Sequence, residues 1–208
     1  MAFRRYGFTL LELLITVALL AVVSLLGFVA VQSSVASAGT AAAKSDVQQA
    51  VRDVMAIMVT ELQTAAKADN DALNPPLDRL AVTANPAANC PIEVSFQVPL
   101  DGTARNWSNR IRFRHYDEDA NNNEWLDSGE DVNGDGVLTR CIWRMEDTNG
   151  DGTPDETREV GGANCISNVQ FVLNGNVLTI TLTATQLLPG FRQNPVTATT
   201  STDVYLLN

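Results

Sequence analysis

The first part of the chain contains a hydrophobic run that is long enough to cross a membrane. Residues 8–31 read FTLLELLITVALLAVVSLLGFVAV, and the one charged residue among them is Glu12. At about 1.5 Å per residue this run would extend roughly 36 Å as a helix, which matches the hydrocarbon core of a bilayer. The pattern therefore predicts a membrane-spanning helix that carries a single carboxylate near its start.

The next segment, residues 44–68, is amphipathic rather than uniformly apolar. Its apolar positions are separated by three or four residues, which predicts a helix with one face packed on another part of the chain. No proline lies between residues 8 and 68, so one helix of about sixty residues with soft points at Gly27 and Gly39 is possible. Two helices with a hinge near residues 33–40 (SSVASAGT) are the alternative, because Ser, Gly and Thr are weak helix formers. The helix must end before the NPP sequence at residues 74–76. The predicted stripe consists of Val47, Val51, Val54, Met58, Leu62 and Ala65.

Beyond Pro76 the hydrophobic pattern changes to that of β-strands. An Asn-Gly-Asn turn signal separates the last two predicted strands and indicates a hairpin. In one strand the arginines alternate with Ile111 and Phe113, which predicts a basic strip on one face that either contacts acidic loops or faces solvent. The expected class is α+β, with the long N-terminal helix packed on an antiparallel sheet of four to six strands. The predicted strands are residues 92–98, 110–116, 139–145, 168–173 and 177–183.

The charge of the molecule is concentrated in one segment. The chain has a formal net charge of -10, and residues 117–159 contain fourteen Asp or Glu and three Arg, a net of -11. Clustered Lys and Arg, which nucleic-acid binding requires, are missing, so nucleic acid is not an expected partner. Such a density of carboxylates repels itself unless a cation neutralises it.

The spacing of these carboxylates predicts structural calcium. Oxygen ligands at alternating positions, with a glycine at the sixth, are typical of calcium-binding loops. Three segments have this spacing of oxygen ligands: the first acidic loop (residues 119–130), the second acidic loop (131–139) and the third acidic loop (147–156). Glu124 at the sixth position of the first loop weakens the prediction there. The second and third loops resemble the short aspartate-rich repeats of thrombospondin type 3 and dockerin-like loops; ordinary Asp-Gly and Asn-Gly hairpin turns are the alternative. The candidate Ca²⁺ ligands are Asp119, Asn121, Asn123, Trp125 (carbonyl), Asp127 and Glu130 in the first loop; Asp131, Asn133, Asp135, Val137 (carbonyl) and Thr139 in the second; and Asp147, Asn149, Asp151, Thr153 (carbonyl) and Asp155 in the third.

Other chemistry is sparse in the sequence. The single histidine, His115, has no neighbouring nucleophile motif, and the chain contains no glycine-rich phosphate loop and no H-E-x-x-H. We therefore expect no enzyme activity. Of the three cysteines, Cys141 and Cys165 each follow an acidic loop, so a disulfide between them is the weakly favoured pairing; Cys90 with either is the alternative.

The first residues resemble a known processing signal. A basic leader, MAFRRYG, precedes Phe8, and Glu12 follows in FTLLE before the unbroken apolar run. This arrangement resembles the cleavage and methylation site of type IV prepilins and type II secretion pseudopilins. The resemblance implies cleavage between Gly7 and Phe8 by a prepilin peptidase and methylation of the new amino terminus. It also implies that Glu12 meets the amine of a neighbouring subunit during filament assembly. A secretory signal peptide with ASA at residues 36–38 and a simple membrane anchor are the alternatives.

The resemblance also implies an organisation and a function. It implies a pilin fold with a leader (residues 1–7), a transmembrane or filament-core helix (8–31), an amphipathic continuation (32–72) and a periplasmic β-sheet head (77–208) that carries the acidic loops (117–159). The chain looks most like PilW-type minor pilins or J-type minor pseudopilins, structural subunits that prime or cap a filament. Expected partners are other pilin or pseudopilin subunits and the inner-membrane assembly platform. The expected location is the inner membrane, then the pilus or pseudopilus, at its tip. A calcium-dependent adhesin displayed on a pilin helix and a simple anchored periplasmic protein remain the rival interpretations.

Overall fold

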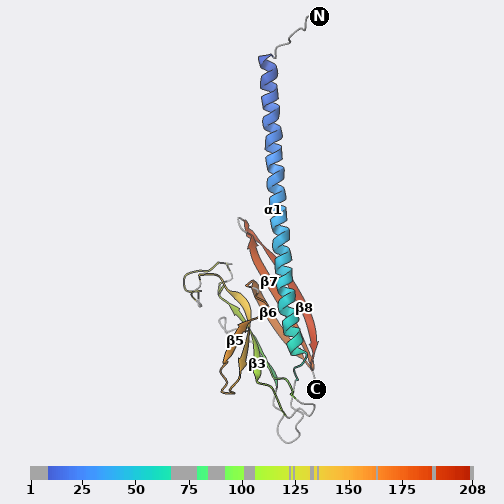
Figure 1. Ribbon diagram of the computed structural model, residues 1–208, viewed down its shortest axis with the longest axis vertical. Helices are drawn as coiled ribbons and strands as arrows, with labels where there is room; N and C mark the ends of the chain where they lie inside the picture. Colours follow the sequence, from blue (N-terminus) through green and yellow to red (C-terminus); the bar gives the residue numbers. More distant parts are fainter. Residues whose placement is uncertain are drawn as a thin grey trace, which may run out of the picture. The chain divides into compact units, whose positions relative to one another are not determined.

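The structure is a computed structural model of the whole chain (Figure 1). It describes residues 9–66, 79–83, 92–100, 106–121, 123, 125–131, 134, 136–162, 164–188 and 191–206. The chain divides into two compact units, Met1–Ala42 and Ala43–Asn208.

One helix, α1 (Leu10–Leu62), contributes to both units. It continues without interruption through residues 33–40, so the alternative of two hinged helices is wrong. It ends at Leu62, earlier than the predicted 68 to 72. The tighter turn that follows explains this end, because the Thr64 N–H donates to the Glu61 carbonyl at 3.2 Å and the Ala65 N–H to the Leu62 carbonyl at 3.1 Å.

The part of α1 in the first unit has no buried residue. The large apolar side chains from Leu10 to Val35 are between 52% and 80% exposed. A window of this helix has a mean hydropathy of 2.8 with none of it buried, so α1 is long and apolar enough to cross a membrane by length and composition. This agrees with the predicted apolar run.

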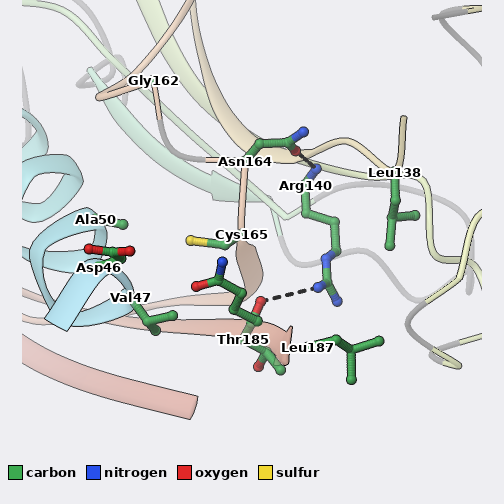
Figure 2. Close-up of a pocket in the computed structure, with 11 residues that line it drawn as sticks. Asp46, Val47, Ala50, Leu138, Arg140, Gly162, Asn164, Cys165, Thr185 and Leu187 are labelled. Atoms are coloured by element: carbon green, nitrogen blue, oxygen red, sulfur yellow. Dashed lines mark hydrogen bonds between the residues drawn. The ribbon is translucent and has the colours of Figure 1, made fainter. Parts of the chain in front are cut away.

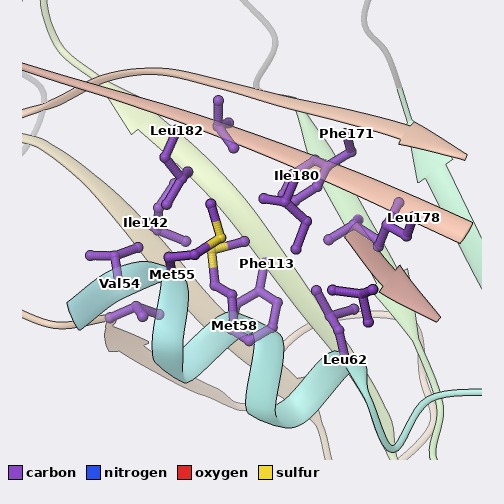
Figure 3. Close-up of a cluster of buried hydrophobic side chains, with 14 of the residues drawn as sticks. Val54, Met55, Met58, Leu62, Phe113, Ile142, Phe171, Leu178, Ile180 and Leu182 are labelled. Carbon is purple, nitrogen blue, oxygen red and sulfur yellow. The ribbon is translucent and has the colours of Figure 1, made fainter. Parts of the chain in front are cut away.

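The part of α1 in the second unit supplies one side of a hydrophobic core. All six residues of the predicted stripe are buried, with exposures of at most 2%, which confirms the predicted amphipathic face. Figure 3 shows Val54, Met58 and Leu62 against side chains from the strands, among them Phe113 and Ile180. Burial of apolar surface contributes about 25 cal/mol per Å² removed from water, so this contact stabilises the head.

The strands form two antiparallel sheets, whereas the sequence predicted one. The first has the order β1-β2-β3-β4-β5 and the second the order β6-β7-β8. The strands of the first sheet are β1 (Leu80–Thr83), β2 (Glu93–Phe96), β3 (Arg110–Asp117), β4 (Arg140–Asp147) and β5 (Glu156–Glu159). Those of the second are β6 (Ile166–Asn174), β7 (Val177–Leu188) and β8 (Phe191–Tyr205).

All five predicted strands are present, as β2, β3, β4, β6 and β7, and three strands were missed. The hairpin between β6 and β7 is also confirmed, since Asn174 pairs with Val177 across a two-residue turn. Gly175 has φ 61° in that turn, a conformation that favours glycine.

The two sheets and the helix of the second unit are joined by polar contacts as well as by the core. His115 on β3 places its Nε2 atom 2.8 Å from the carbonyl oxygen of Ile166 on β6. Arg144 on β4 reaches the helix, where its Nε donates to both carboxylate oxygens of Glu61 at 2.7 and 3.0 Å. The exposed Arg158 on β5 donates to the same carboxylate at 3.2 Å. One helix residue therefore holds two neighbouring strands.

Candidate functional site

The residues predicted for processing, Gly7 and Phe8, lie outside the described residues. Glu12 lies in the exposed first turn of α1. Its backbone N–H donates to the Thr9 carbonyl at 3.1 Å and to Thr9 Oγ1 at 3.3 Å. Thr9 therefore caps the helix, a role that the T-x-x-E spacing could have predicted but that was missed. An acidic side chain in the first turn also interacts favourably with the positive end of the helix dipole. Glu12 therefore stabilises the start of α1, besides any role in assembly.

The basic strip on β3 is on the predicted face and contacts an acidic loop. Ile111 and Phe113 are buried in the core, which confirms the alternation. Arg112 Nη2 donates to the Gly152 carbonyl of the third acidic loop at 2.8 Å, and its Nε lies 3.9 Å from Glu93 Oε1. The sequence predicted that the strip either contacts acidic loops or faces solvent. Arg112 contacts an acidic loop.

In the first acidic loop the predicted ligand residues contact one another. Asn121 Nδ2 and Asn123 Nδ2 both donate to Asp127 Oδ2, at 2.9 and 2.7 Å. These hydrogen bonds lower the pKa of the Asp127 carboxyl below its usual value, because they stabilise the charged form. Glu130 Oε2 accepts the Asp127 N–H at 3.0 Å. The side chain of Trp125 is 46% exposed at the rim of this loop.

The first-position carboxylate of this loop, Asp119, is placed differently. Its side chain is fully buried, and its Oδ2 atom lies 3.6 Å from Nη1 of Arg140, the first residue of β4. Next to it, Glu118 is also buried and accepts hydrogen bonds from the Tyr116 hydroxyl and the Thr139 N–H, both at 2.9 Å. Burial and the contact with Glu118 raise the pKa of Tyr116 to about 12.

The second and third acidic loops share a different arrangement of the first aspartate. Asp131 accepts the N–H groups of Gly134 and Gly136 at 2.6 and 3.0 Å. Asp147 likewise accepts those of Gly150 and Gly152, at 2.7 and 2.9 Å. The glycines at the sixth position have φ 73° in the second loop and 90° in the third, which the turn requires. The ligand candidates Asn133 and Asp135 of the second loop lie outside the described residues.

All the predicted calcium ligands of the third loop lie within the described residues. Asp155 Oδ2 accepts the N–H groups of Thr148 and Asn149, at 2.8 and 3.1 Å. Asp151 Oδ1 accepts the Thr153 N–H at 2.7 Å and also the Thr153 hydroxyl. These bonds lower the pKa of Asp151 and keep it ionised. Within the described part of the chain, no three or more His, Cys, Asp or Glu side chains are grouped as a metal site. The residues of the third loop therefore have the type and spacing of calcium ligands. In this structure their carboxylates accept hydrogen bonds from backbone N–H groups of the same loop.

The predicted disulfide between Cys141 and Cys165 is not formed, because both are free thiols. Ile142 on β4 points into the core, so its neighbour Cys141 points to the opposite face of the sheet. Cys165 packs against the core instead. Burial raises the pKa of Cys141 to about 12 and that of Cys165 above its usual value. The alternative partner, Cys90, lies outside the described residues.

A cavity of about 430 Å³ lies where the helix and the strands of the second unit meet (Figure 2). Asp46 and Val47 line it from the helix, Arg140 from β4, and Cys165 and Thr185 from the second sheet. His115 Nε2 contacts the carbonyl of Ile166, the residue that follows Cys165 in the sequence. Burial lowers the pKa of this histidine below 6.5. Its partial burial and its contact with a backbone carbonyl favour a structural role.

The fold and the N-terminal segment together define a class of protein. One long apolar N-terminal helix followed by antiparallel sheets is consistent with the α+β pilin fold. Residues 3–28 match the prokaryotic N-terminal methylation motif, which is the class III signal peptide of type IV pilins and pseudopilins. The predicted resemblance is thereby confirmed for the N-terminal motif, and the match supports a type IV pilin or pseudopilin and points to a structural protein. No match to this chain was found among curated proteins or among solved structures.

The same match also bears on the partners and the location of the protein. The motif implies interaction with other pilins and with the prepilin peptidase. Together with the apolar helix, it supports membrane anchoring of a single-pass protein.

Proposed function

We propose that this chain is a minor pilin or pseudopilin that primes or caps a filament of the type IV pilus or type II secretion class. The methylation motif at residues 3–28 is the observation that carries the proposal. The apolar half of α1 supports it further, because it presents an apolar surface on every side and carries one acidic side chain in its first turn.

In this proposal, cleavage creates a positive amine at Phe8, and Glu12 of a neighbouring subunit neutralises it. A charge in an apolar environment is tolerated mainly when an opposite charge lies close to it. This pairing would set the register between subunits. Glu12→Gln should therefore reduce assembly while leaving cleavage intact, because it keeps the size and removes the charge.

The intact mass of the membrane-extracted protein tests the processing step. We expect loss of residues 1–7 and the addition of one methyl group to Phe8. Gly7→Val provides the matched control, since a branched side chain before the cut should block cleavage without changing the helix. A full-length wild-type chain, or one cut near Ala38, would contradict the proposal.

The position in the filament rests on the size and charge of the head. The acidic loops concentrate a net of -11 in residues 117–159, and stacking such heads along a shaft would bring like charges together. A tip position avoids this repetition. Immunogold labelling should therefore place the protein at filament ends, and labelling along whole shafts would contradict a tip role.

We also propose that calcium stabilises the head, with the third acidic loop as its best site. Its donor set, its spacing and the positive φ of Gly152 support this. At a calcium concentration a hundred times the dissociation constant, binding would add about 2.7 kcal/mol to folding stability. Thermal unfolding with calcium and with a chelator tests it. Asp151→Asn should remove most of the difference, and the exposed Asp203→Asn on β8 should leave it unchanged. Equal melting with and without calcium would contradict the calcium proposal alone.

The same aspartate substitutions distinguish a filament subunit from a displayed adhesin. If the chain primes a filament, loss of calcium binding should reduce the number of filaments. If filaments remain and only attachment to surfaces is lost, the chain is an adhesin and the priming proposal fails.

A further inference from the structure

The first acidic loop is paired with a cation from another part of the chain, Arg140 at the start of β4. Asp119, which stands at the first ligand position, has a side chain with no exposed surface. Its Oδ2 atom lies 3.6 Å from Arg140 Nη1, and its Oδ1 atom accepts the Asn123 N–H at 2.9 Å. The Asp119 carboxylate is therefore neutralised by the Arg140 guanidinium, and it also accepts a backbone hydrogen bond from Asn123.

Arg140 is held in this position from several sides. Its side chain is 7% exposed. Its Nη2 donates to the Thr185 carbonyl of β7 at 3.2 Å, and its backbone N–H donates to Asn164 Oδ1 at 2.5 Å, both of which are drawn in Figure 2. Because the same side chain joins the first acidic loop to the second sheet, moving it away from Asp119 would also break a contact between the sheets.

The third acidic loop lacks this arrangement. Asp147 stands at the first position of this loop. Its two carboxylate oxygens accept hydrogen bonds from the N–H groups of Gly150 and Gly152. The arginine that contacts this loop, Arg112, donates to a backbone carbonyl and not to a carboxylate. The ion pairs found between described residues include none with Asp147, Asp151 or Asp155.

We infer that the Arg140 guanidinium takes the place of a metal ion in the first acidic loop, and that this loop therefore does not bind calcium. A divalent cation at Asp119 would have to approach a fixed positive charge, which opposes binding in a buried site of low dielectric. The sequence of this loop agrees, because Glu124 stands where glycine would make the sharp turn of a calcium loop. The inference rests on the calcium proposal only for its contrast with the third loop. It revises the sequence prediction of calcium ligands in the first loop. Arg140 is thus a positioning residue that orders the first loop and couples it to the seam between the sheets.

Calcium titration of the full chain in detergent micelles tests the inference. The background variant carries Asp135→Asn, Asp151→Asn and Asp155→Asn, which remove ligands from the second and third loops. Trp125, 46% exposed in the first loop, reports binding there by fluorescence, and equilibrium dialysis counts the bound calcium. We expect no binding in this background up to millimolar calcium.

Adding Arg140→Gln to the background should then create a response of Trp125 to calcium below about 1 mM, because the repelling charge is gone. Arg144→Gln is the matched control, since it removes a β4 arginine that pairs with Glu61 instead, and it should produce no response. A Trp125 response in the background itself, or no response after Arg140→Gln, would overturn the inference. If Arg140→Gln fails to fold by circular dichroism, the background titration decides alone, because Arg140 is intact there.

The calcium proposal and this inference can fail separately. A wild-type chain that binds no calcium refutes the calcium proposal, yet a gain on Arg140→Gln would still support the role of Arg140. A background that binds calcium at the first loop refutes the inference and leaves calcium stabilisation of the head in place.

Discussion

The two halves of α1 have the same secondary structure and opposite surroundings. From residue 9 to residue 42 none of the residues is buried, and Leu20 is 70% exposed. From Ala43 to Leu62, the stripe that includes Val54 and Met58 is completely buried. The first half is apolar on every side and the second on one side only. A helix that is apolar all round has to be covered by a membrane or by other chains, whereas an amphipathic helix can be covered by its own domain. The distribution of apolar side chains, and not their number, thus separates an assembly surface from a core.

The largest expected effect separates these halves directly. Met58→Ala should lower the free energy of unfolding of the head by about 2–5 kcal/mol, because it leaves a cavity in a packed core. Leu20→Ala removes an aliphatic side chain of similar size from the exposed half and should leave that value unchanged. Denaturant unfolding of both variants in the same detergent measures the difference. Equal losses would contradict the distinction between an exposed and a packed half of the helix.

Glycines in the two units should respond in opposite directions. Gly161 has φ 75°, and a Cβ there would lie 2.9 Å from Val54 Cγ2. Gly161→Ala should therefore cost about 1–3 kcal/mol, while Gly27→Ala, with nothing within 4 Å, should stabilise the helix by about 0.5–1 kcal/mol. Gly162→Ala is the control for backbone strain alone, because its φ is 59° and its Cβ would meet nothing within 4 Å. Thermal unfolding should give the lowest midpoint for Gly161→Ala, an intermediate one for Gly162→Ala and the highest for Gly27→Ala. Similar losses at Gly161 and Gly162 would show that the contact with Val54 is unimportant.

The hydrogen bonds between the second half of α1 and the strands are expected to contribute less to the free energy of unfolding than its apolar core does. Glu61→Gln keeps the shape of the side chain but weakens its bonds to Arg144 and Arg158, which should cost about 1–2 kcal/mol because the pairs are partly exposed. Asp53→Asn, on an exposed position of the same helix, is the matched control and should change the unfolding free energy little. A loss at Glu61 no larger than at Asp53 would show that the ion pairs do not stabilise the head.

The smallest effect is a dependence on pH. Hydrogen bonding by Arg144 holds the pKa of the Glu146 carboxyl below 4.5 in the folded head. A carboxyl with a depressed folded pKa contributes stability above its unfolded pKa, and this contribution is lost as the pH falls through the folded value. Glu146→Gln should therefore flatten the acid side of the stability profile between about pH 6 and pH 3, by less than about 1 kcal/mol. Unfolding measured across that range tests it, and a parallel loss in both proteins would contradict the assignment.

The strands that were missed explain where sequence patterns lose information. In β8 threonines occupy both faces, since Thr199 and Thr200 are neighbours, so no alternation marks the strand. In β5 every residue is polar and exposed. Two sheets rather than one form because pairing depends on contacts between distant segments, which local patterns do not report. In the same way, the spacing of Asp119 and Asn121 is visible in the sequence, but the partner of Asp119 begins a later strand and could not be found.

The sequence by itself determined the features that depend on local periodicity. The processing motif, the apolar run, the buried stripe and the spacing of the acidic loops are all short-range patterns, and side chains three or four residues apart on a helix share a face whatever surrounds them. The tertiary structure alone decided the division into two sheets, the different surroundings of the Cys141 and Cys165 thiols and the pairing of Asp119 with Arg140. These depend on strand register and on which segments meet, and a shift of one residue along a strand moves a side chain to the other face.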